Sequence, residues 1–166
     1  MVELIKCSLY MPTGATVITE LDRDFRLIPN FRLWELANNE ATDEQTVDGV
    51  RFAIDSMWGW LFLSMYQCSR NHFGRLDGTS VYRTQAYNDS LKNATPNSQH
   101  CHTQAADVLL RGVQTFDEWI DWWEKLCNLN HQIGAIGLYN SPDRVHIEIG
   151  SDRRYGATKF QVRDNR

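Results

Sequence analysis

The sequence predicts an α+β fold, in which a small antiparallel sheet has helices packed on one side. Two observations support the sheet, and one supports the helices. Four segments have the β-prone composition or alternating polarity of strands, and they lie near residues 80–84, 106–112, 133–139 and 144–149. The last two flank the turn sequence Asn140-Ser141-Pro142-Asp143, which predicts a hairpin beside the strand at 106–112. Segments with apolar residues at helical spacing lie before and between these strands.

Length and composition predict one domain. The chain has 166 residues, of which 42% are hydrophobic, enough for one well-buried core but too few for two domains. We expect a single domain over 1–166, with an N-terminal extension and short helix over 1–46 and the core over 47–156. The net charge of −4 gives no electrostatic reason to expect nucleic acid as a partner. The four cysteines show no CxxC spacing, so we do not expect a structural zinc site built from them. They permit three disulfide pairings, but we expect free thiols. The oligomeric state stays open.

The N-terminal extension is expected to contain little regular structure. Residues 1–30 are predicted to be irregular, with short strand-like pieces such as 15–18. The segment Asn30–Ala37 mixes apolar and charged residues at helical spacing, which predicts a short helix that caps the core.

The longest helix is predicted over residues 48–72, where apolar residues recur at helical spacing. A membrane span is the alternative explanation of so apolar a segment. However, Arg51 and Asp55 interrupt the pattern, and the uncharged run over 56–69 is shorter than the ~20 residues that a bilayer requires. We therefore expect a core helix, no membrane span, and a helix end at Gly74 in a left-handed conformation.

Two further helices are predicted. The segment Gln85–Lys92 is one of them. The other begins at Thr115, because Thr115 and Glu118 have the spacing of a capping box. Its tryptophans Trp119 and Trp123 are expected to cover one face of the sheet.

The strongest chemical signal is a set of potential metal ligands, His100, Asp107 and His146. Two imidazoles and one carboxylate suit a catalytic zinc ion, with a fourth position left for water. A helix would separate His100 and Asp107 by about 10.5 Å along its axis, and a straight strand by roughly 23 Å. Neither allows both residues to bind one ion at about 2.0–2.2 Å. The chain must therefore bend, with His100 on a loop and Asp107 entering the strand at 106–112.

Three segments resemble a known family. Ser98-x-His100-x-x-Thr103-x-Ala105-x-Asp107 resembles the S-x-H-x-x-G-x-A-x-D signature of the zinc D-alanyl-D-alanine peptidases and their L-alanyl-D-glutamate relatives. Asp143-x-x-His146 resembles the family's [DE]-x-x-H, and Val81-Tyr82-Arg83-Thr84…Asn88 resembles its upstream Y-R-[ST]…N segment. Order and approximate spacing agree over roughly residues 80–155. Thr103 departs from the family, which favours glycine there, so the bend between the ligands is less free in backbone angle.

The resemblance implies a hedgehog/DD-peptidase-like fold and a peptidase that uses Zn²⁺ bound by His100, Asp107 and His146. It implies that Asp143 acts as general base and takes the proton of the attacking water. It also implies that Arg83 grips a substrate carboxylate or stabilises the oxyanion formed during attack.

Three other residues are expected to support this chemistry. Ser98 is expected either to hydrogen-bond substrate or to fix the ligand loop, and Tyr139 is expected to contact substrate. Glu148 shares a strand face with His146, which makes it a rival base to Asp143 or a residue that orients His146.

Other local patterns offer alternatives to this site. His102 could replace His100 as a ligand, but only His100 has the family's seven-residue separation from Asp107. Cys101 and His102 could form a nucleophile and base, but adjacent strand residues point apart. These histidines and aspartates could also be ordinary polar core or loop residues.

The implied substrate is a stem peptide of bacterial peptidoglycan, and the sequence does not separate cleavage of D-Ala-D-Ala from cleavage of L-Ala-D-Glu. The first residues lack a long apolar run followed by a small-residue cleavage site, so no secretory signal is evident. We therefore expect action on the cell wall after release from the cytoplasm, as phage lysis enzymes act. The alternative is a non-catalytic module that keeps the zinc scaffold for binding or for virion structure.

Overall fold

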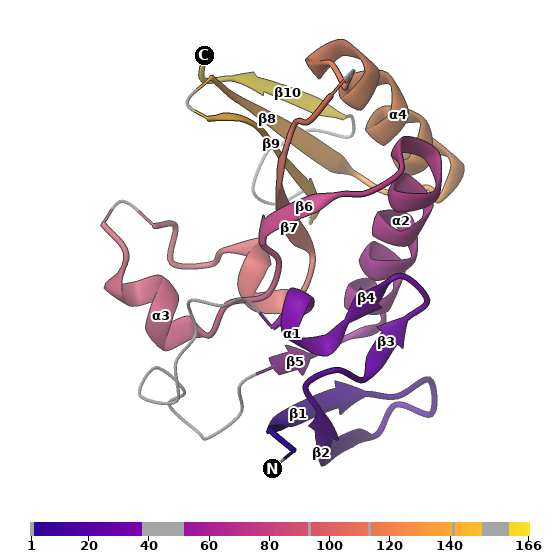
Figure 1. Cartoon of the computed structure of the whole chain (residues 1–166), viewed down its shortest axis with the longest axis vertical. Coiled ribbons are helices and arrows are strands. Elements are labelled where there is room, and N and C mark those ends of the chain that lie inside the picture. Colours follow the sequence, from indigo (N-terminus) through magenta and orange to yellow (C-terminus); the bar gives the residue numbers. More distant parts are fainter. Residues whose placement is uncertain (1, 38–51, 93, 113, 141, 151–159) are drawn as a thin grey trace.

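The structure is a computed structural model of the whole chain. It describes residues 2–37, 52–92, 94–112, 114–140, 142–150 and 160–166 (Figure 1). The general α+β class predicted from the sequence is confirmed.

The main sheet has five strands in the order β10-β8-β9-β7-β6. Their bounds are Gln161–Asp164 for β10, Gly134–Asn140 for β8, Asp143–Ile149 for β9, Ala105–Leu109 for β7 and Asp77–Ser80 for β6. All neighbours are antiparallel except β10 and β8. The four predicted strands are therefore present, but β6 ends at Ser80 and leaves residues 81–84 outside the strand.

The hairpin of β8 and β9 sets the register that the site depends on. Asn140 pairs with Asp143, and along the hairpin Gly137 pairs with His146. On the other side of β9, His146 pairs with Asp107 of β7. The predicted hairpin is confirmed, and it brings Asp107 and His146 to adjacent strands.

Two helices cover one face of this sheet, α2 (Met57–Phe73) and α4 (Phe116–Leu129) (Figure 1). The predicted capping box starts α4, since Glu118 N donates to Thr115 Oγ1 at 3.2 Å and Thr115 N donates to the Glu118 carboxylate at 2.9 Å. Trp119 and Trp123 are fully buried, and Trp123 Nε1 donates to Glu148 O at 3.1 Å. The sheet residues beneath these helices are apolar and buried: Val108, Ile136, Leu138, Val145, Ile147 and Ile149.

Side chains alternate along a strand, so the residues between these apolar positions lie on the opposite face of the sheet. That face carries Asp107 from β7, His146 and Glu148 from β9, and Arg163 from β10. The sheet thus separates an apolar core on one side from a cluster of ionisable groups on the other.

The prediction for the longest helix was partly wrong. Residues 48–51 of the predicted helix lie outside the described residues, and Phe52–Ile54 form a strand, β5, parallel to β1 (Leu4–Tyr10). The helix begins only at Met57 and ends at Gly74, which has a positive φ of 82°. Strand pairing with the distant β1 overrides the local helical pattern here. Among the described residues, no helix has the length and apolar character needed to cross a membrane.

The N-terminal segment is more regular than expected. Strand β1 forms an antiparallel hairpin with β2 (Thr16–Asp22), and β3 (Arg26–Ile28) pairs with β4 (Phe31–Arg32). The helix predicted over 30–37 is reduced to one turn, α1 (Leu33–Leu36).

The C-terminal residues also differ from expectation. Gln161–Asp164, beyond the predicted core of 47–156, form β10 on the edge of the main sheet. Two short helices complete the fold, α3 (Gln85–Ser90) and the 3₁₀ turn η2 (Gln99–His102). The four cysteines are free, as expected.

Candidate metal centre

A sharp bend between η2 and β7 brings His100 toward Asp107. Thr103 makes this bend with a left-handed backbone, at φ 55° and ψ 38°. This conformation is uncommon for a β-branched residue and easy for glycine, and the resembling family favours glycine at this position. Thr103 is fully buried, and its hydroxyl donates to Ala53 O, an interaction that glycine could not make. The hydrogen bond to β5 thus helps to hold the strained turn in place.

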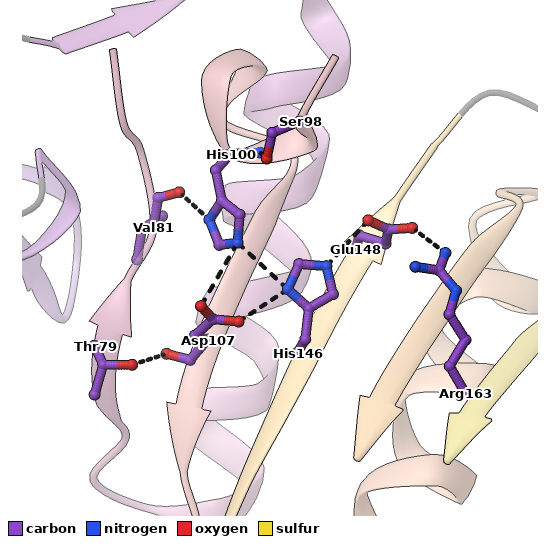
Figure 2. A network of polar contacts seen from close by, with 8 residues as sticks. All are labelled: Thr79, Val81, Ser98, His100, Asp107, His146, Glu148 and Arg163. Carbon is purple, nitrogen blue, oxygen red and sulfur yellow. Dashed lines mark hydrogen bonds and ion pairs between the residues drawn. The ribbon is translucent and has the colours of Figure 1, made fainter. Parts of the chain in front are cut away.

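Three side chains converge on one point from η2, β7 and β9 (Figure 2). His146 Nδ1 lies 2.9 Å from Asp107 Oδ1 and 3.3 Å from His100 Nε2. His100 Nε2 lies 3.8 Å from Asp107 Oδ2. Ligands about 2.0–2.2 Å from one tetrahedral ion lie roughly 3.3–3.6 Å from each other. The three donor atoms are therefore spaced so that small adjustments allow them to bind one metal ion.

The outer nitrogens of both histidines are also paired. His100 Nδ1 lies 2.7 Å from Val81 O, so it carries the proton and leaves Nε2 free to face the centre. His146 Nε2 lies 3.0 Å from Glu148 Oε2, and Glu148 Oε1 accepts from Arg163 Nη2 at 2.7 Å. Figure 2 shows this chain of contacts running from the cluster to β10. These partners orient both rings as metal ligands require.

Burial and nearby charges determine which of the three side chains carry a proton at pH 7. Burial lowers the pKa of His100 to about 3, so this imidazole is neutral at pH 7. Burial alone would raise the pKa of Asp107, but the hydrogen bond from His146 and nearby positive charges outweigh it and hold that pKa well below its usual range. Burial alone would likewise lower the pKa of His146, but hydrogen bonds to Asp107 and Glu148 raise it to about 9. Without metal, His146 is therefore a cation between two carboxylates.

A metal ion held by these three side chains, such as the expected zinc, would bind more tightly as the pH rises to about 9. A metal ion needs the unprotonated Nδ1 of His146, and below the raised pKa of about 9 it must displace a proton from this ring. His100 is already neutral, so one proton is released per ion and the apparent affinity falls about tenfold for each pH unit below 9. Competition titrations with a chromophoric chelator at about pH 6.5, 7.5 and 8.5 measure this slope.

The same proton stabilises the metal-free protein. The pKa of His146 is raised above the ordinary histidine value of 6.5, so this stabilisation is complete below pH 6.5 and is lost as the pH rises toward 9. A zinc affinity that does not change between about pH 6.5 and 8.5 would contradict the proposed protonation of His146.

The structure brings some of the other predicted residues to the centre. Arg83 lies beside His100: its backbone N donates to His100 O at 3.3 Å, and its charge helps to lower the pKa of that imidazole. Ser98 Oγ accepts from His100 N at 3.4 Å, which favours its role in fixing the ligand loop. Tyr139 is half-buried on the same sheet face as His146.

Other predicted residues are not brought to the centre. His102 Nδ1 lies 2.5 Å from Asp55 Oδ2 on the surface and takes no part in the cluster. Asp143 is exposed at the start of β9, three residues before His146, and its pairing with Asn140 places it on the opposite sheet face. The structure therefore does not place the Asp143 carboxylate beside the ligands, although the sequence motif implies that it is the base. Glu148 is the carboxylate of β9 that shares the face of His146.

Two residues near the site were not identified from the sequence. Arg144 lies two residues before His146 on β9, and the alternation of the strand could have identified it. Arg163 could not have been found in this way, because it reaches Glu148 only through the parallel pairing of β10 with β8.

Comparisons of this chain with models of protein families, with curated proteins and with solved structures find no match.

Proposed function

We propose that this chain is a zinc-dependent peptidase that hydrolyses a peptide bond in the stem peptides of bacterial peptidoglycan. The observation that carries the proposal is the convergence of His100 Nε2, His146 Nδ1 and the Asp107 carboxylate, with each outer imidazole nitrogen paired to an acceptor. A structural zinc site normally has four protein ligands, and a catalytic site has three. Three described ligands therefore favour a catalytic centre.

The substrate class rests on the resemblance of three segments to the zinc D-alanyl-D-alanine peptidases and their L-alanyl-D-glutamate relatives. The first histidine, the aspartate and the last histidine of those motifs lie here on η2, β7 and β9. The resemblance also supports a hedgehog/DD-peptidase-like arrangement of the sheet, with α2 and α4 behind it and the ligands in front.

In this proposal His100, Asp107 and His146 would hold the zinc ion. When bound, zinc supplies the Lewis acidity that activates water at neutral pH. The half-buried Arg83, beside His100, supplies a positive charge for the oxyanion that develops on the scissile carbonyl. Glu148 keeps His146 in the orientation that a ligand needs, because it accepts from Nε2 and is itself held by Arg163.

The proton acceptor is the point on which motif and geometry differ. The motif assigns it to Asp143, whose side chain would reach the centre only if the turn at 140–143 rearranged. The register instead places Glu148 beside His146, but this carboxylate is 2% exposed and its oxygens already accept from His146 Nε2 and Arg163 Nη2, so it would have to break one of these contacts to act as the base. Variants of these two carboxylates separate the alternatives.

Digestion of purified peptidoglycan tests the proposal. The zinc-loaded protein is expected to release peptide fragments whose masses identify the cleaved bond, and the same protein treated with a chelator is expected to release none. Restored activity on adding zinc back shows that the metal, rather than chelator damage, is responsible. Empty digests from protein that demonstrably holds zinc would overturn the peptidase and favour a zinc-scaffold module that binds without catalysis.

A further inference from the structure

A second arginine, besides Arg83, lies near the candidate centre. Arg144 lies on β9, two residues from His146 and on the same face of the sheet. Its neighbour across the hairpin is Tyr139, and the carbon at the centre of the Arg144 guanidinium lies 4.8 Å from the centre of the Tyr139 ring. Stacking on an aromatic ring fixes the plane of a guanidinium while leaving its outer N–H groups free to donate.

Within the described part of the chain, Arg144 stacks on this ring but has no carboxylate partner. Its Nε is buried and has no hydrogen-bond acceptor there. The charge of Arg144 helps to lower the pKa of Asp107, but the two oxygens of the Asp107 carboxylate face His146 and His100. A partly buried guanidinium without an anion is costly, because desolvation is not compensated by pairing. A bound anion would remove this cost.

A glycine on the sheet makes room for the Tyr139 ring that Arg144 stacks on. Gly137 lies opposite His146 on β8, and a Cβ atom there would lie 3.3 Å from the Tyr139 ring and 3.4 Å from His146 Cβ. Gly137 therefore lets the Tyr139 ring lie against the sheet next to His146, and this fixes the position of the ring on which Arg144 stacks.

We propose that Arg144, held against Tyr139, binds a carboxylate of the substrate that lies one residue beyond the scissile carbonyl. This inference rests on the proposed peptidase function and specifies its substrate: the residue after the cleaved bond must carry a free carboxylate. Arg83, whose backbone N donates to His100 O, is then available for the oxyanion.

The spacing of the sheet agrees with this assignment. Residues two apart on a strand lie about 6.6–6.8 Å apart, which is the step from His146 to Arg144. An extended peptide advances about 3.3–3.6 Å per residue, and a guanidinium donates to a carboxylate across roughly 2.7–2.9 Å. A carboxylate one residue past a carbonyl held at the ligands therefore comes within reach of Arg144.

Two stem-peptide bonds offer this carboxylate. In D-Ala-D-Ala it is the C-terminal carboxylate, and in L-Ala-D-Glu with a γ-linked continuation it is the α-carboxylate of the glutamate. The test uses both peptides, each as the free acid and with that carboxylate converted to an amide. The zinc-loaded wild type is expected to cleave at least one acid with a kcat/KM roughly 10- to 100-fold above that of its amide.

Variants assign this preference to Arg144. Arg144→Gln is expected to lose the preference by lowering kcat/KM for the acid, and Arg144→Lys is expected to recover part of it, since the charge is kept but the planar fork is lost. Arg111→Gln is the matched control, because it removes an arginine that pairs with Asp77 away from the site. Equal kcat/KM for acid and amide in the wild type would overturn the inference.

A binding measurement keeps the inference separate from catalysis. Calorimetry with acetyl-D-alanine and acetyl-D-alaninamide, on zinc-loaded and metal-free protein, is expected to show binding of the acid that Arg144→Gln weakens roughly tenfold or more. If no peptide is cleaved but this discrimination persists, the peptidase proposal fails and the carboxylate site stands. If peptides are cleaved but the protein does not discriminate between the acid and the amide, the peptidase proposal stands and the carboxylate site fails.

Discussion

Asp107→Asn is expected to abolish measurable peptidase activity and to weaken zinc binding by more than 100-fold. Residues that only support a ligand typically contribute about 10- to 100-fold to metal affinity, and Asp107 is a ligand itself. Its carboxylate also supplies the only negative charge among the three converging side chains, and the hydrogen bond to His146 holds that ring in place. An asparagine amide keeps the shape but loses the charge. Zinc competition titrations and peptide release from peptidoglycan measure the two effects.

The matched control is Asp164→Asn. This carboxylate is exposed on β10, pairs with Arg166 at 2.7 Å and lies outside the cluster, so zinc affinity and activity are expected to stay at wild-type values. Circular dichroism confirms that both variants are folded. Wild-type zinc affinity in a folded Asp107→Asn protein would show that the three side chains do not form a metal site.

The second large effect is expected from Glu148→Gln, with a loss of roughly 10- to 100-fold in zinc affinity or in kcat/KM. Glutamine can still accept from His146 Nε2, but the negative charge facing His146 and Arg163 is lost. In contrast, Asp143→Asn is expected to change either quantity by less than about twofold, because the register of β9 directs this side chain to the other face. Parallel titrations and kinetics on the two variants measure the difference.

The reverse result is equally informative. If Asp143→Asn loses activity by about a hundredfold while zinc affinity is retained, the turn at 140–143 must carry this carboxylate to the centre during the reaction. The assignment made from the family-like motif would then stand, and the one made from the strand register would fail. Arg163→Gln supports the interpretation of Glu148, since it releases the outer oxygen of this carboxylate without touching the ligands.

Local sequence determined several parts of this protein. The spacing of His100 and Asp107 required a bend, and the structure forms it at Thr103. The turn sequence at 140–143 predicted the hairpin, and Thr115 with Glu118 predicted the start of α4. These features depend on interactions between residues close in the chain, such as caps, turns and alternation, which a single sequence displays directly.

Only the tertiary structure decided the rest. The pairing of β5 with β1 ended the helical pattern before Met57, and the pairing of β10 with β8 delivered Arg163 to Glu148. Likewise, the register of β9 on β7 and β8 determined that His146 lies beside Asp107 and that Arg144 lies beside Tyr139. Such pairings join segments far apart in sequence, and their free energy comes from the packing and hydrogen bonds of the whole sheet. A local sequence pattern does not indicate which distant strand will provide this packing and these hydrogen bonds.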